Sequence, residues 1–190
     1  MSMIDPPRYY TGIGSRETPT QVLEQMAEIG TRLAEQGYVL RSGGARGADT
    51  AFERGCDAAR GAKQIWDIYQ TYVSRNLLDW ALEKASSVCW EFPLEKMKPY
   101  TVSIIVRNMY QVYGDPETLE EATPTDFVVY WAKGNPLEKG RESGGTRYAV
   151  RQAHAIGIPT YNLRTQGDEF AKMLRWYLKE DTTCTKPSSP

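Results

Sequence analysis

The chain has 190 residues, of which 41% are hydrophobic and 25% are charged. This composition is typical of a globular domain, and the length allows a core that needs no disulfide or metal. With 23 Lys and Arg against 24 Asp and Glu, the net charge is −1. That balance excludes a protein that gathers nucleic acid through a strongly basic overall field.

Neither a membrane span nor a metal centre is expected. No apolar run approaches the ~20 residues of a membrane-spanning helix, and the first residues lack the basic and then apolar plan of a signal peptide. We therefore expect a cytoplasmic protein. The cysteines Cys56, Cys89 and Cys184 are widely spaced, and His154 is the single histidine. A zinc site or a histidine-based triad would lack ligands, so we predict reduced cysteines, no metal and no cofactor.

Strand-like and helical patterns alternate along the chain. In chain order they are a strand at 8–13, a helix from Pro19, a strand at 38–42, a helix at 48–59, a strand at 62–69, a helix around 77–85, a helix at 100–113, a strand at 126–131, a loop at 133–143, a helix at 147–156, a strand at 157–163 and a helix that Asp168 caps and that ends near 178.

The first helix carries the clearest end signals. Thr18 is predicted as its N-cap, with Pro19 at the first helical position and Gln21 completing a capping box. Apolar residues then recur at helical spacing as far as Leu33, and Gly37 stands where a left-handed residue ends a helix.

The alternation predicts the fold class. Strands that are apolar without interruption are typical of a parallel sheet covered on both faces. We predict an α/β protein with a Rossmann-like, doubly wound, mainly parallel sheet and helices on both faces. Residues 1–180 are expected to form one domain, and residues 181–190 a disordered tail.

Three glycine clusters each lie between a predicted strand and a predicted helix. We name them the first loop (residues 12–16), the second loop (residues 42–47) and the third loop (residues 143–147). Glycine lets backbone N–H groups approach a ligand, and the following helix adds partial positive charge, so such loops favour phosphate. Because the strands of a doubly wound sheet end along one edge, we expect the loops to meet at one crevice.

Two common phosphate motifs are absent. The first loop lacks the third glycine of the dinucleotide fingerprint, because Glu17 stands in its place. The GxxxxGK[ST] pattern of P-loop nucleoside triphosphatases does not occur either.

These motifs resemble a known superfamily. Residues 11–16 with Thr18 and Pro19, together with residues 41–49, look like the DprA/Smf end of the SLOG superfamily. That superfamily has a Rossmann-like fold and includes the DNA-processing protein DprA and the cytokinin-activating Lonely guy phosphoribohydrolases. Residues 107–112 and 144–163 look like a small branch of it that is common in phages and mobile elements. The resemblance spans about residues 9–163.

The resemblance implies a ligand and the residues that hold it. Members of the superfamily bind phosphate and ribose with the three loops. Carried over position by position, the ligand-binding residues are Gly12, Gly14, Ser15 and Arg16, then Ser42, Gly43, Gly44 and Arg46, then Gly144, Gly145 and Thr146. Relatives often pair through helices beside the site, so the resemblance also implies a homo-oligomer.

The catalytic glutamate of the Lonely guy enzymes has no counterpart here. It lies three residues after the threonine of their glycine-rich motif, and Ala149 takes that position when the threonine is aligned with Thr146. Asp49 and Glu53, one helical turn apart, and Glu142, just before the third loop, are carboxylates that could substitute for it.

One further pair of ligand-binding candidates comes from the helix at 100–113. Arg107 and Asn108 interrupt an otherwise apolar helix, and an arginine in that setting suits an anion.

Three functions remain open at this point. The first is binding of a nucleotide-type ligand, such as a nucleoside monophosphate or an ADP-ribose-like molecule, for sensing, sequestration or processing. The second is hydrolysis of the N-glycosidic bond of a nucleoside 5′-phosphate, which needs a carboxylate near the ribose. The third is binding of single-stranded DNA, as the resemblance to DprA implies. All three functions require the three loops to meet at one crevice, with some of their backbone N–H groups not bonded to acceptors of the protein itself.

Overall fold

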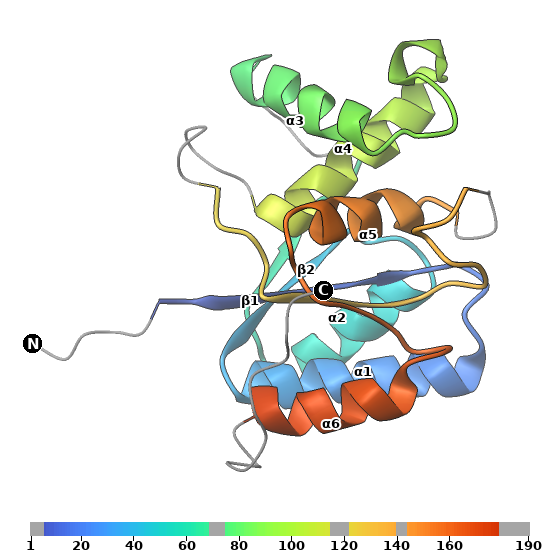
Figure 1. Ribbon diagram of the computed structural model, residues 1–190. Coiled ribbons are helices and arrows are strands. Elements are labelled where there is room, and N and C mark those ends of the chain that lie inside the picture. The colour runs from blue at the N-terminus through green and yellow to red at the C-terminus, as the bar shows by residue number, and fades with distance from the viewer. Residues whose placement is uncertain (1–5, 69–74, 115–121, 140–143, 179–190) are drawn as a thin grey trace, which may run out of the picture.

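The computed structural model describes residues 6–68, 75–114, 122–139 and 144–178 (Figure 1). Glu142, Ser143, the last residue of the strand predicted at 62–69 and the predicted tail lie outside these residues. In chain order the elements are β1 (Arg8–Gly14), α1 (Thr20–Glu35), β2 (Tyr38–Ser42), α2 (Ala48–Ala58), β3 (Lys63–Ile65), α3 (Arg75–Ser87), the 3₁₀ helix η1 (Leu94–Lys96), α4 (Pro99–Tyr113), β4 (Phe127–Trp131), α5 (Thr146–Ala155), β5 (Thr160–Asn162) and α6 (Gly167–Tyr177).

The five strands form one sheet in the order β3-β2-β1-β4-β5. Each neighbouring pair is parallel, which confirms the predicted fold class of a Rossmann-like α/β protein. The chain builds outward from β1 to β3 on one side and then crosses to β4 and β5 on the other. The order therefore reverses between β1 and β4, where ligand crevices of such sheets lie.

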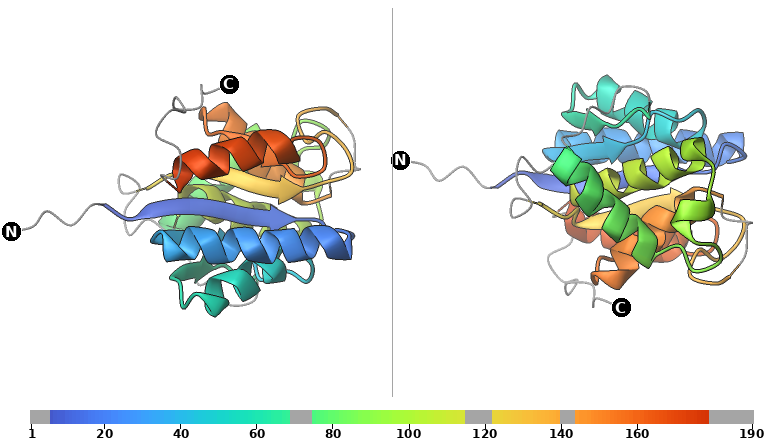
Figure 2. Two further views of the ribbon diagram at one scale, coloured as in Figure 1. Left: turned by 90° about the horizontal axis from the view of Figure 1, so that it is seen from below. Right: turned by 90° about the horizontal axis from the view of Figure 1, so that it is seen from above.

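Helices cover both faces of the sheet. On one face, α1, α2 and α6 pack on Tyr10, Leu40 and Phe127, and on the other α4 and α5 pack on Val128 and Tyr130. The views from below and above show these two layers (Figure 2). All five residues of β4 are buried, as its uninterrupted apolar run predicts for a central parallel strand.

A third layer lies outside α4 and α5. Helix α3 packs on them through a second apolar cluster that includes Ala81, Ala85 and Ile105 (Figure 1). Arg151 of α5, almost completely buried, joins the layers because its guanidinium binds both carboxylate oxygens of Glu91, at 2.8 and 2.5 Å. The same guanidinium donates to three backbone carbonyl groups, so its burial is compensated.

The predicted capping of two helices is wrong. Pro19 is the N-cap of α1 and no side chain caps that helix, because the Thr18 hydroxyl donates instead to the carbonyl oxygen of Ser15 at 2.7 Å. The N-cap of α6 is Gln166. Asp168 lies inside the first turn of α6, since the helix already begins one residue before it.

Two strands are shorter than predicted. β3 ends at Ile65, after which Trp66 turns into the cluster beneath α3 and α4. β5 begins only at Thr160, because Gly157 adopts a left-handed conformation (φ 74°) and Pro159 has no N–H to donate to a neighbouring strand. No helix in the described part of the chain is long and apolar enough to cross a bilayer.

The approach of α1 to α2 yields a test of the packing. A Cβ on Gly55 would lie 1.9 Å from the carbonyl oxygen of Ala27 in α1, whereas a Cβ on Gly167 would meet nothing within 4 Å. We expect Gly55→Ala to lower the free energy of unfolding by about 2 kcal/mol or more, because the helices must separate. Gly167→Ala, the matched control, should leave it unchanged or raise it by about 0.5 kcal/mol. Urea unfolding measures both, and equal stability of the two variants would contradict this packing.

Candidate functional site

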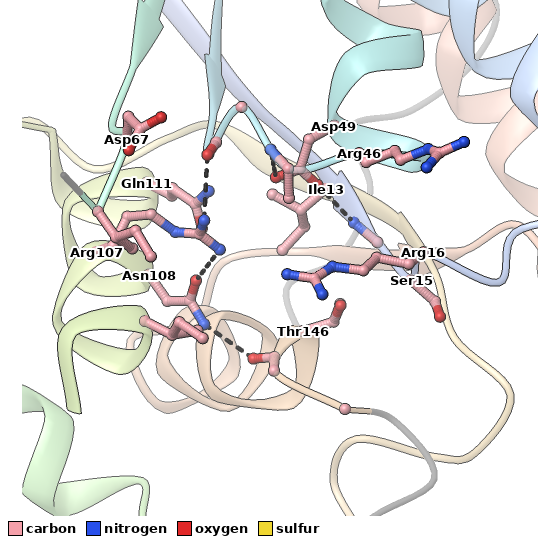
Figure 3. Close-up of a pocket in the computed structure, with 18 of the residues that line it drawn as sticks. Ile13, Ser15, Arg16, Arg46, Asp49, Asp67, Arg107, Asn108, Gln111 and Thr146 are labelled. Atoms are coloured by element: carbon pink, nitrogen blue, oxygen red, sulfur yellow. Dashed lines mark hydrogen bonds between the residues drawn. The ribbon is translucent and has the colours of Figure 1, made fainter. Parts of the chain in front are cut away.

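The three glycine loops meet around one cavity of about 570 Å³ at the carboxyl ends of the strands. Its walls come from these loops, from α4 and from the residues that follow β3 (Figure 3). Most of the predicted site residues line it, namely Gly14, Ser15, Arg16, Gly43, Gly44, Arg46, Asp49, Arg107, Asn108, Gly144, Gly145 and Thr146. The geometric expectation of a single crevice is therefore met.

Three predicted site residues lie elsewhere. A Cβ on Gly12 would be 2.7 Å from Cγ of Phe52, so the missing side chain lets β1 approach α2 rather than a ligand. Ser42 is completely buried at the end of β2, and Glu53 on α2 is half-buried; neither lines the cavity. Glu142 lies outside the described residues.

Asp49 joins the first loop to the second. Its Oδ1 accepts the backbone N–H of Gly14 at 3.2 Å and its Oδ2 accepts that of Ala45 at 3.3 Å. The side chain is almost completely buried in the first turn of α2. Burial raises the pKa of this carboxyl to about 6, although the charge of Arg107 and the two N–H bonds act in the opposite direction.

Fewer backbone N–H groups of the first two loops are available to bind phosphate than the sequence predicts. Besides the two N–H groups that Asp49 binds, the N–H of Ser15 donates to the carbonyl oxygen of Trp131 at 3.1 Å. The N–H of Gly47 donates to the hydroxyl of Thr50 at 3.2 Å. Several of the backbone donors predicted to hold phosphate are thus occupied by the protein itself.

Helix α4 holds the second and third loops. Arg107 donates to the carbonyl oxygen of Gly43 at 3.1 Å, and Nδ2 of Asn108 donates to that of Gly145 at 2.8 Å. The two side chains also contact each other, because Arg107 donates to Oδ1 of Asn108 at 3.4 Å (Figure 3). This residue pair therefore positions the loops that line the cavity.

The start of α5 remains open to the cavity. Gly144 adopts a left-handed conformation (φ 56°) and Gly145 is the N-cap of the helix. Within the described ranges, the backbone N–H groups of Gly145 and Thr146 have no acceptor. The first turn of a helix with unoccupied N–H groups is suited to an anion.

Charged side chains surround this opening. The guanidinium of Arg16 points into the cavity, whereas that of Arg46 points away from its centre (Figure 3). Glu17 at the rim forms an ion pair with Lys133 at 2.5 Å. Arg16 makes no ion pair with any carboxylate that the structure describes, so it can meet a ligand anion.

Eight residues that line the cavity were not among the predicted site residues, namely Ile13, Glu17, Ala45, Asp67, Ile68, Tyr100, Ile104 and Gln111. Three of them lie on α4 at spacings of four and seven residues, which is one face of a helix. The polar pair Arg107 and Asn108 on the predicted helix was a usable signal, because Gln111 follows one turn later. Asp67 carried no comparable signal, since β3 was predicted to continue through it.

The raised pKa of Asp49 predicts a pH dependence of stability. Its pKa of about 6 in the folded protein exceeds the value of about 3.9 for an unfolded chain, so the folded state binds the proton more tightly. The stabilisation that this tighter proton binding gives the folded state is fully present below about pH 4. It is lost as pH rises to about 6, which lowers the free energy of unfolding by up to about 3 kcal/mol. Urea unfolding from pH 4 to 7 should show this decline, reduced in Asp49→Asn. Identical slopes in both proteins would contradict it.

Comparisons with protein-family models, curated proteins and solved structures found no match to this chain. The likeness to the SLOG superfamily therefore remains a prediction from the loop motifs.

Proposed function

We propose that the cavity binds a nucleotide or a nucleotide-derived molecule, such as a nucleoside monophosphate or an ADP-ribose-like compound. The observation that carries this proposal is that the N-terminus of α5 opens into the same cavity as Arg16. Among the described residues, the first N–H groups of α5 have no acceptor and Arg16 has no ion pair. A phosphate group placed there receives backbone N–H bonds, the helix dipole and a guanidinium.

The rest of the cavity suits the remainder of such a ligand. Its volume of about 570 Å³ falls within the range of small-molecule sites. Ile68, Tyr100 and Ile104 supply apolar and aromatic surface next to the polar loops. Half of the Tyr100 side chain is exposed, which allows its ring to contact a base. The likeness of the loop motifs to the SLOG superfamily supports the same class of ligand.

Placing a carboxylate at the start of α5 tests this proposal. Gly145 has a right-handed helical backbone conformation (φ −69°, ψ −25°), which aspartate also adopts, and its Cβ would lie 3.3 Å from Cγ2 of Ile104. We expect Gly145→Asp to weaken binding of AMP or ADP-ribose at least about tenfold, because the carboxylate repels the phosphate and occupies its site. Calorimetric titration measures the dissociation constants.

Gly167→Asp is the matched control. It places the same residue in the first turn of α6, where a Cβ meets no atom within 4 Å. It should bind the nucleotide as the wild type does. Unchanged affinity in Gly145→Asp, or no binding of either nucleotide to the wild type, would overturn the proposal.

A second candidate function is hydrolysis of the N-glycosidic bond of a bound nucleoside 5′-phosphate. Of the three carboxylates considered from the sequence, Asp49 lines the cavity, and its pKa of about 6 lies near neutral pH, as suits a general acid or base. Binding of single-stranded DNA stays a prediction from the resemblance alone.

Release of free base from AMP tests the hydrolytic candidate. If Asp49 acts as the acid or base, Asp49→Asn should lower the rate about 100-fold or more. Asp57→Asn, an exposed carboxylate on the same helix that pairs with Lys63, should leave the rate unchanged. Chromatography of the products measures both rates. An equal rate in Asp49→Asn and in the wild type would contradict this candidate function.

A further inference from the structure

Gln111 is a buried polar residue at the cavity without hydrogen bonds from its side chain. Only 1% of Gln111 is exposed, and it lines the cavity from α4. Neither Nε2 nor Oε1 of its carboxamide has a partner among the described residues. Nε of Arg107, one turn earlier on the same helix, is also buried without a partner. Three polar atoms in one turn of α4 are thus unsatisfied.

The stability of the fold does not explain why a carboxamide occupies position 111. The backbone of Gln111 is held, since its carbonyl oxygen accepts the hydroxyl of Thr11 at 2.6 Å. The carboxamide, however, packs against Gly43, where a Cβ would come within 2.4 Å of Nε2. Burying a carboxamide without partners destabilises a protein, and methionine would occupy similar space without that cost. Unsatisfied polar groups of this kind concentrate at functional sites.

We propose that Gln111 determines ligand specificity by binding the neutral part of the nucleotide, at a group that offers a hydrogen-bond donor beside an acceptor. This inference rests on the proposed function. A carboxamide needs both an acceptor for its NH₂ and a donor for its oxygen. The phosphate monoester of a nucleotide is mainly a dianion at neutral pH, which accepts hydrogen bonds and has no proton to donate, so it satisfies one of these. A base edge or the ribose diol satisfies both.

The position of Gln111 agrees with this division of the ligand. Asn108 holds Gly145 at the proposed phosphate position, and Gln111 lies about one helical turn further along α4, a rise of about 5 Å. That distance is about the size of a ribose ring. Since the carboxamide has no hydrogen-bond partner among the described residues, none of its protein hydrogen bonds there has to break when it binds a ligand.

The test compares Gln111→Met with the wild type. Removing the unsatisfied carboxamide should raise Tm by about 3 °C. It should also weaken AMP binding about tenfold, while binding of inorganic phosphate stays unchanged. Stability that rises as affinity falls is a signature that a purely structural glutamine would not give. Differential scanning calorimetry and calorimetric titration provide the two measurements.

Gln152→Met is the matched control. Gln152 is also almost completely buried and its Oε1 has no partner among the described residues, but its Nε2 donates to the hydroxyl of Tyr113 at 2.8 Å and it does not line the cavity. This variant should lose stability and bind AMP as the wild type does.

One further probe, ribose 5-phosphate, identifies the group that Gln111 binds. Equal losses of affinity for AMP and for ribose 5-phosphate in Gln111→Met would assign it to the ribose, and a loss for AMP alone would assign it to the base. Either pattern supports the proposal. Unchanged AMP affinity, or a variant that is less stable or does not fold, would overturn it. If the wild type binds none of these probes, the proposed function itself fails, and the inference fails with it.

Discussion

The architecture of the site depends on the parallel pairing of β1 with a strand on each side. β2 pairs on one side and β4 on the other, and the order of the sheet reverses at this point. Parallel strands end at the same edge, so the loops after β1 and β2 and the start of α5 face one another. In the β1–β4 register, Gly14 lies beside Trp131, and the next residue donates its N–H to that tryptophan's carbonyl oxygen. The cavity is a consequence of this pairing.

Within the cavity, the polar groups divide into those that hold the loops and those that remain open to a ligand. Asp49, Arg107 and Asn108 bind backbone groups of the three loops. The carboxylate of Asp49 stands where a ligand anion would otherwise be expected, since it binds N–H groups next to the start of α2. In the function proposed above, Arg16 and the first turn of α5 bind the anion, and Gln111 binds a neutral group. A preformed site of this kind loses less entropy on binding than loops that must be ordered by the ligand.

The fold could be predicted from the sequence because its signals are local. β2 has the predicted bounds, and the five buried residues of β4 follow from its apolar run. The predictions were wrong where a tertiary contact competes with a local preference. Thr18 has a side chain typical of a helix cap, yet its hydroxyl donates to the carbonyl oxygen of Ser15 in the preceding turn. Trp66 continues a strand-like pattern, yet its ring is buried in the cluster beneath α3 and α4.

The amino-acid sequence by itself determined the parallel α/β architecture and the place where the three glycine loops meet, since hydrophobic periodicity and strand direction specify both. Only the tertiary structure decided which groups hold the loops and which stay open. The partners concerned are far apart in the chain, as with Asn108 and Gly145, separated by 37 positions, or Arg107 and Gly43, separated by 64. The hydrogen bonds they form depend on how whole helices pack, and no local propensity encodes that packing.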